Sequence, residues 1–233
     1  MNKECFVSVL LPTRKRTKMV EHSVASVLEL ATNPDQIEIA IAYDDDDEES
    51  HRYFTSDQWQ MFVKSRGGTQ VVFQCPKWGY GELHNYYNLM AQRTQGQWLL
   101  AWNDDAVMLS PGWDQQLREI GDFQGMVHMH CTTYPKLTLF PLFPRSWVDF
   151  FGSATACNHI DSWIQDICYE AGTVKKIEAQ ILHDRFSETG NNNDETFQNR
   201  TWQGKKIYKS DAMRQVRHEW AQRWAKRCEQ LVK

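Results

Sequence analysis

Strand-like and helix-like segments alternate along the first half of this chain, and this alternation limits the folds open to it. Apolar segments typical of strands span residues 6–11, 37–43 and 70–75, and a fourth begins at Trp98. Apolar residues at helical spacing separate them, at about 17–32, 53–64 and 82–93. Strands that alternate with helices predict a parallel sheet with right-handed crossovers.

Three of the predicted strands are followed directly by polar residues. In a doubly wound sheet the carboxyl ends of parallel strands lie at one edge, where ligands of open α/β sheets bind. We therefore expect the polar groups at these three strand ends to lie together, namely Pro12, Thr13, Arg14, Asp44, Asp45, Asn103, Asp104 and Asp105.

The apolar run at 98–102 ends in one amide and two adjacent carboxylates, Asp104 and Asp105. Neighbouring acids repel each other unless a proton or a cation neutralises them. A divalent ion with oxygen ligands is one solution, and Mg²⁺ bound in this way usually also holds the phosphates of a substrate. The alternative interpretation is a solvated turn after the strand, because Asn and Asp favour turns.

The second half of the chain is less regular. Short strands are predicted at 125–130 and 137–140, a longer one at 175–183, and helices at 145–151 and 159–171. The polar, turn-rich residues 187–194 predict a mobile loop, and a long helix is expected from about Asp211. Because no internal repeat or interdomain linker is recognisable, we expect one domain over residues 1–233.

Composition argues against several classes of protein. A net charge of −4 over 233 residues does not suit a nucleic-acid-binding surface. No segment approaches the roughly 20 apolar residues that span a bilayer, and the first residues lack the apolar region of a signal peptide. We therefore expect a soluble, cytoplasmic protein whose six cysteines, which form no CxxC pair, are free thiols.

The order and spacing of several motifs resemble the GT-A glycosyltransferases, specifically the inverting enzymes of family 2. Residues 7–14 are similar to that family's opening strand and nucleotide-contacting loop, and 43–45 to its aspartates that face uracil and ribose. Asn88 and Gly96 reproduce its Asn-then-Gly spacing before the metal strand. Residues 102–105, followed by 110–113, resemble its Asp-x-Asp motif and the Pro-Gly segment after it. Residues 160–172 resemble its acidic acceptor-side helix. The resemblance covers roughly residues 6–184.

The resemblance implies a GT-A-like α/β domain with a Rossmann-like, mostly parallel central sheet flanked by helices. A nucleotide-binding half would span about 1–105, a smaller acceptor-side half 106–183, and a mobile loop with a C-terminal helix 184–233. The implied activity is that of a metal-dependent, non-processive, inverting hexosyltransferase-type enzyme. It would move a sugar from a nucleotide-diphospho-sugar, with UDP favoured, to a hydroxyl of a saccharide or another acceptor.

The resemblance also implies roles for single residues. His183 and Asn103 would join Asp105 in holding a divalent ion, either Mn²⁺ or Mg²⁺, and an imidazole ligand favours Mn²⁺. Asp161 is the candidate general base for the acceptor hydroxyl, with Asp166 one turn on as the substitute; the alternative role of Asp161 is to cap its helix. Donor binding falls to Pro12, Thr13, Arg14, Asp44, Asp45, Asn88 and Asp104.

Other charged residues are open to two interpretations. Lys77, in a glycine-rich loop beside the expected donor site, is a candidate phosphate ligand. Lys15, Arg16 and Lys18 extend a basic patch beside the expected donor edge, and the alternative is a solvated face, which is typical of such a run. The basic C-terminal helix is expected to pack across the sheet, with contact to an anionic membrane surface as the alternative.

The chain also departs from the family pattern. Asp46 and Asp47 replace the usual Gly-Ser, Asn103 replaces the first acid of Asp-x-Asp, and the Gln-x-x-Arg-Trp motif of processive synthases is missing. Two other classes stay open. One is a non-catalytic sugar-nucleotide-binding or scaffold protein of the same fold. The other is a nucleotidylyltransferase, which needs a glycine-rich loop that residues 12–16 do not supply.

Overall fold

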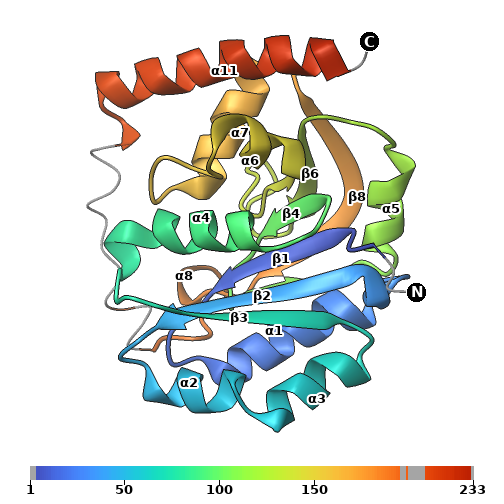
Figure 1. Cartoon of the computed structure of the whole chain (residues 1–233), viewed down its shortest axis with the longest axis vertical. Coiled ribbons are helices and arrows are strands. Elements are labelled where there is room, and N and C mark those ends of the chain that lie inside the picture. Colours follow the sequence, from blue (N-terminus) through green and yellow to red (C-terminus); the bar gives the residue numbers. More distant parts are fainter. Residues whose placement is uncertain (1–3, 195–197, 199–207, 232–233) are drawn as a thin grey trace.

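A computed structural model describes residues 4–194, 198 and 208–231 of the chain. Its centre is an eight-stranded sheet of order β3-β2-β1-β4-β7-β6-β8-β5 (Figure 1). The strands are β1 (Val7–Pro12), β2 (Ile37–Asp44), β3 (Thr69–Cys75), β4 (Trp98–Ala101), β5 (Ala106–Met108), β6 (Met126–Cys131), β7 (Leu142–Pro144) and β8 (Val174–His183).

The predicted α/β fold is confirmed. β3, β2, β1 and β4 are neighbours and run parallel, as the alternation of strands and helices predicts. Beyond β4 the sheet becomes mixed, because β7 pairs antiparallel with β4 and β6, whereas β6 and β8 are parallel and β5 is an antiparallel edge strand. Among the described pairings the sheet is therefore mostly parallel.

Helices cover both faces of the sheet. In Figure 1, α1, α2 and α3 lie below the first strands, and α4, α6, α7 and α11 lie above them. The helices are α1 (Thr17–Glu29), α2 (Glu48–Phe54), α3 (Asp57–Ser65), α4 (Leu83–Arg93), α5 (Trp113–Glu119), α6 (Arg145–Phe151), α7 (Ile160–Glu170), α8 (Phe186–Thr189) and α11 (Asp211–Leu231), with short 3₁₀ turns η1 (Pro34–Gln36) and η2 (Tyr80–Glu82).

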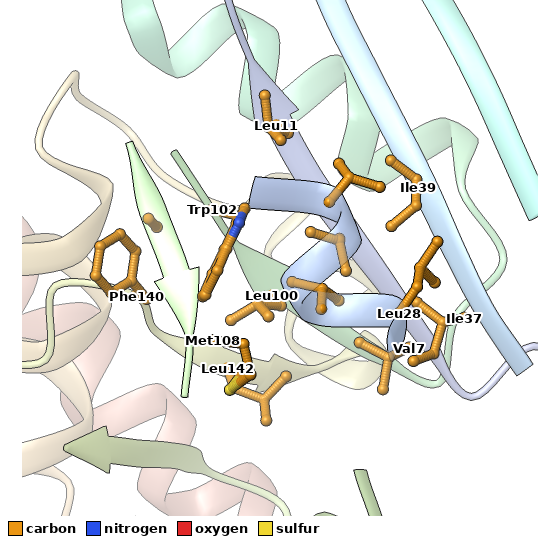
Figure 2. Close-up of a cluster of buried hydrophobic side chains, with 14 of the residues drawn as sticks. Val7, Leu11, Leu28, Ile37, Ile39, Leu100, Trp102, Met108, Phe140 and Leu142 are labelled. Atoms are coloured by element: carbon orange, nitrogen blue, oxygen red, sulfur yellow. The ribbon is translucent and has the colours of Figure 1, made fainter. Parts of the chain in front are cut away.

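Alternate residues of the central strands enter two separate hydrophobic clusters. Ile37 and Ile39 of β2 pack with α1 and the side chains drawn in Figure 2. Ala40 and Ala42, at the alternate positions of the same strand, belong to the other cluster together with Tyr87 of α4. Successive strand residues point to opposite faces, so a strand buried on both sides reads as a continuous apolar run.

Some expected boundaries were wrong. The helix expected at 53–64 is two helices, because the Ser56 hydroxyl caps a new helix by accepting from the Trp59 N–H. Residues 137–140 form no strand; β7 follows at 142–144, and the Thr138 N–H donates to the side chain of Gln165 instead. The strand β5 and the helix α5 were not predicted.

The C-terminal helix packs on α6 and α7, on the α4 side of the sheet, and not directly across the sheet as expected. Trp224 of α11 is fully buried, and its ring lies 5.0 Å from that of Trp147 of α6. Packing therefore accounts for the burial of Trp224, and contact of the helix with a membrane surface stays a prediction. None of the helices in the described part is long and apolar enough to cross a bilayer. All six cysteines are free thiols, as expected.

Candidate active site

A cavity of about 440 Å³ opens at the carboxyl edge of the sheet, a size that suits a small ligand. Its walls come from the segments that follow β1, β2, β3, β4 and β8. The lining residues are Pro12, Thr13, Arg14, Lys15, Arg16, Asp44, Lys77, Gly79, Tyr80, Leu83, Tyr86, Asn103, Asp104, Asp105, His183 and Arg185. The structure thus brings together most of the residues that the sequence singled out.

The loop after β1 is bent sharply at Lys15. Lys15 adopts a left-handed backbone conformation, with φ of 54°, which costs a residue with a side chain on the order of 1 kcal/mol. Its backbone N–H donates to Asp47 Oδ2 over 2.8 Å, which fixes the bend to the end of β2. The flanking Arg14 and Arg16 both line the cavity.

Arg14 and Lys77 share the acids that follow β2. Arg14 donates to Asp44 Oδ2 over 2.7 Å and also pairs with Asp46. Lys77 Nζ lies 2.8 Å from Asp46 Oδ2, which also accepts from Arg14 Nη2 over 3.1 Å. The hydrogen bond from Arg14, followed by that from Lys77, holds the pKa of Asp46 well below its ordinary value. Two of the acids that follow β2, Asp44 and Asp46, therefore form ion pairs with cationic residues that line the cavity.

Tyr86 connects Asp44 to the loop after β3, a role that the sequence did not reveal. Its hydroxyl donates to Asp44 and accepts from the backbone N–H groups of Trp78 and Gly79, over 3.1 and 3.0 Å. Tyr86 lies on the buried face of α4, and the hydroxyl of a buried tyrosine needs a hydrogen-bond partner. The helical spacing of Tyr86 is therefore the feature of the sequence that could have pointed to this role. Through its hydrogen bonds, Tyr86 positions the loop that carries Lys77.

Both carboxylate oxygens of Asp104 accept hydrogen bonds from residues of the loop after β1. Its Oδ2 accepts from the Thr13 hydroxyl and its Oδ1 from Arg16 Nη1, each over 2.8 Å. Burial raises the pKa of Asp104, and the positive charge of Arg16 opposes this rise. Because both oxygens are engaged, the described structure assigns Asp104 to holding Thr13 and Arg16 in place; direct contact with a nucleotide stays a prediction.

Asp105 and His183 form the pair best suited to a cation. Asp105 Oδ1 is buried without a hydrogen bond of good geometry among the described residues, and His183 Nε2 lies 3.2 Å from it. Burial favours the neutral form of Asp105, but the contact with His183 and the charges of Arg16 and Arg185 outweigh it, so that its pKa is lowered. Two ligand atoms at this spacing fit one ion with bonds of about 2.1 Å to each.

The third predicted metal ligand is oriented by the protein itself. The Tyr87 hydroxyl lies 3.0 Å from the carbonyl oxygen of Trp102 and 3.1 Å from Oδ1 of Asn103, and both are acceptors. The single hydrogen of this hydroxyl is shared between the two acceptors, so Asn103 Oδ1 keeps capacity for a further partner. No group of three or more His, Cys, Asp or Glu side chains that suits a metal occurs in the described ranges.

Asp161 does not line the cavity, but its charge interacts with that of His183, which does. The N-cap of α7 is His159, so Asp161 sits in the first turn of the helix and not at the cap position. Burial raises its pKa, while the backbone N–H of Ser162 and the charges of His159 and His183 oppose the rise. The substitute candidate, Asp166, is engaged by the Tyr208 hydroxyl.

Two residues predicted to bind donor lie outside the cavity. The Asn88 side chain donates to the Thr155 carbonyl and accepts from the N–H groups of Ala154 and Thr155, at 2.9–3.1 Å. Asn88 therefore ties α4 to the loop before α7. Asp45 is exposed, and its backbone N–H donates to the Cys75 carbonyl over 2.7 Å.

The chain matches no protein-family model, and no curated protein matches it in sequence. Many solved structures are similar to it in fold, and three of them illustrate the likeness. S. aureus TarS 1–349 in complex with UDP aligns with a TM-score of 0.54 and 11% identity, over 76% of this chain and 60% of that one. The same protein in complex with UDP-GlcNAc aligns with a TM-score of 0.53 and 12% identity, over 94% and 71% of the two chains.

The third is the mannosyltransferase PcManGT from Pyrobaculum calidifontis, in complex with GDP-Man and Mn²⁺. It aligns with a TM-score of 0.57 and 13% identity, over 97% of this chain and 74% of that one. At these identities the likeness shows the fold alone. The GT-A-like fold implied by the sequence motifs is thus confirmed.

Proposed function

We propose that this chain is a non-processive glycosyltransferase that moves a sugar from a nucleoside-diphospho-sugar, with UDP favoured, to an acceptor hydroxyl. The observation that carries the proposal is the cavity at the carboxyl edge of the sheet, where Arg and Lys side chains lie beside the Asp105–His183 pair. Similar folds that hold UDP, UDP-GlcNAc or GDP-Man support it.

The donor would bind across the ends of the first strands. Pro12, Thr13 and Asp44 would contact the nucleoside, and Arg14 and Lys77 would meet the diphosphate, because guanidinium and ammonium groups suit phosphate oxygens. Most of the cavity-lining residues precede position 106. This supports a nucleotide-binding half at about 1–105 and an acceptor side at 106–183.

A divalent ion fits the remaining pair. Asp105 and His183 would hold it, and two protein ligands suit an ion that completes its coordination shell with substrate phosphates and water. The imidazole favours Mn²⁺ over Mg²⁺. When bound, the ion would stabilise the negative charge of the departing diphosphate as a Lewis acid. Asn103 is the weaker candidate ligand, because its amide oxygen carries no charge and lies within hydrogen-bond distance of the Tyr87 hydroxyl.

Asp161 would act as the base. It would take the proton of the acceptor hydroxyl, whose oxygen then bonds to the anomeric carbon as the bond to the diphosphate breaks on the opposite face. This displacement inverts the anomeric centre. A carboxylate whose pKa is raised by burial is a better base near neutral pH than an exposed one.

Calorimetric titration of UDP, GDP and their common sugars, with and without Mn²⁺, tests the donor site. We expect one nucleotide family to bind, and to bind more tightly with the metal. Asp161→Asn should retain donor affinity and lose about 100-fold or more in donor turnover. A non-catalytic binding protein of the same fold would show no turnover to lose. Absence of binding by every nucleotide would contradict the proposal.

The metal assignment has its own variants. Asp105→Asn should abolish the gain in donor affinity from Mn²⁺, because it removes the negative charge beside His183 and replaces one of the two carboxylate oxygens by an NH₂ group, which cannot bind a metal ion. Asp211→Asn is the matched control, since the Asp211 side chain is 96% exposed and lies outside the cavity lining. Retention of the full metal effect in Asp105→Asn would show that the ion is held elsewhere or not at all.

A further inference from the structure

Arg16 is the most deeply enclosed of the cavity's arginines for which an ion pair is described. Only 9% of its side chain is exposed, against 27% for Arg14. Its guanidinium lies between two carboxylates. Nη1 donates to Asp104, and the opposite edge, Nε and Nη2, donates to the two oxygens of Asp194 over 2.6 Å each.

The two carboxylates differ in how firmly they are built in. The side chain of Asp104 is 8% exposed and also accepts a hydrogen bond from Thr13. It therefore cannot move away from Arg16 without breaking both buried interactions. The side chain of Asp194 is 37% exposed and comes from the segment after β8, 178 residues away in the sequence. Nη1 of Arg16 is therefore held by a buried carboxylate, whereas its Nε–Nη2 edge is covered by a partly exposed one.

The contact with Asp194 has the geometry of an anion site. Two parallel N–H groups of one guanidinium edge meet two oxygens of one anion, the bidentate arrangement that arginine uses for carboxylates and for phosphates alike. Arg16 lines the same cavity as Arg14, Lys77 and Arg185. An edge in this arrangement accepts a phosphate group as readily as a carboxylate.

We infer that the Nε–Nη2 edge of Arg16 is a diphosphate-binding subsite, which Asp194 occupies in the free chain and must leave when a donor binds. The inference rests on the proposed function for its choice of ligand. The exchange replaces one bidentate anion by another and returns a partly exposed carboxylate to water. Asp194 is then a built-in competitor that lowers the affinity for diphosphates.

The test compares wild-type protein with Asp194→Asn by calorimetry, using inorganic pyrophosphate, UDP and GDP as probes. Removal of the competing charge should tighten the binding of pyrophosphate and of the nucleotide that the protein accepts by about fivefold or more. Arg16→Gln should weaken the binding of both in either background. Asp211→Asn is the matched control, because it removes the same charge at a site that is 96% exposed, and it should change nothing.

The outcomes separate the two proposals. Equal or weaker binding by Asp194→Asn, in a protein that binds a nucleoside diphosphate, overturns the subsite and leaves the proposed function standing. Tighter binding of pyrophosphate without binding of any nucleotide supports the subsite and counts against the proposed function. An equal gain in Asp211→Asn would assign the effect to net charge and overturn the inference, as would a lack of pyrophosphate binding in every variant.

Discussion

Gly96 marks the place where the chain entering β4 passes closest to β1. A Cβ at this position would lie 2.3 Å from the backbone nitrogen of Ser8 and 2.7 Å from the carbonyl oxygen of Trp98. Since backbone atoms cannot yield as a side chain can, we expect Gly96→Ala to lower the free energy of unfolding by about 3 kcal/mol. Urea unfolding measures the loss.

Gly81→Ala is the control for this prediction. Gly81 has no left-handed backbone angle, and a Cβ there would meet no atom within 4 Å. The stability of Gly81→Ala should stay within about 0.5 kcal/mol of wild type. If Gly96→Ala were equally harmless, the close approach of the two strands would be wrong.

Single residues show where sequence reasoning ends. The aspartates after β4 were placed correctly in the cavity because their position depends only on the strand that precedes them. The interpretation of the basic patch as solvated holds for Lys18, whose side chain is 79% exposed, and fails for Arg16, whose partners lie 88 and 178 residues away. Likewise, Asn88 bonds to residues 66 and 67 positions away. Such partners are set by tertiary structure.

At the level of elements, α11 is held by its tryptophans. Trp224 is fully buried against Trp147 and Phe151. We expect Trp224→Ala to lower the free energy of unfolding by about 3–5 kcal/mol, the usual cost of emptying a large aromatic site. Gln222→Ala, on the exposed side of the same helix, should be nearly neutral. Denaturant unfolding of both variants measures the difference.

The same variant tests whether α11 serves the cavity. No residue of α11 lines it in the part of the chain that is described. Folded Trp224→Ala should therefore bind nucleotides as the wild type does. A folded variant with weakened nucleotide binding would show that this helix also shapes the site.

The boundaries were predicted best for helices and strands that have a regular apolar pattern or a clear turn residue at one end. The helix at 145–151 and the strand at 174–183 were found within one residue of expectation. The order of strands beyond β4 was not predictable, because β7, β6, β8 and β5 are joined by pairings of mixed direction that no local pattern encodes. The loop expected at 187–194 has a short helix at its start, α8, and the Asp194 contact at its end.

On the scale of the whole molecule, the charge of the cavity opposes that of the chain. The chain carries a net charge of −4, whereas five Arg and Lys side chains and three Asp side chains line the cavity. A concave site with low-dielectric walls concentrates the field of its own charges. The molecule as a whole should therefore repel anions weakly while this one edge of the sheet attracts them.

The attraction predicts a salt dependence specific to charged ligands. The distance over which charges act falls from about 10 Å at 0.1 M salt to about 3 Å at 1 M. Because the cationic side chains act together on a diphosphate, we expect its dissociation constant to rise about three- to tenfold across this range. Calorimetry with UDP or GDP, whichever binds, measures it. The matching uncharged nucleoside should show no such rise, and equal salt sensitivity of the two would mean that the base, and not the phosphates, meets the charged wall of the cavity.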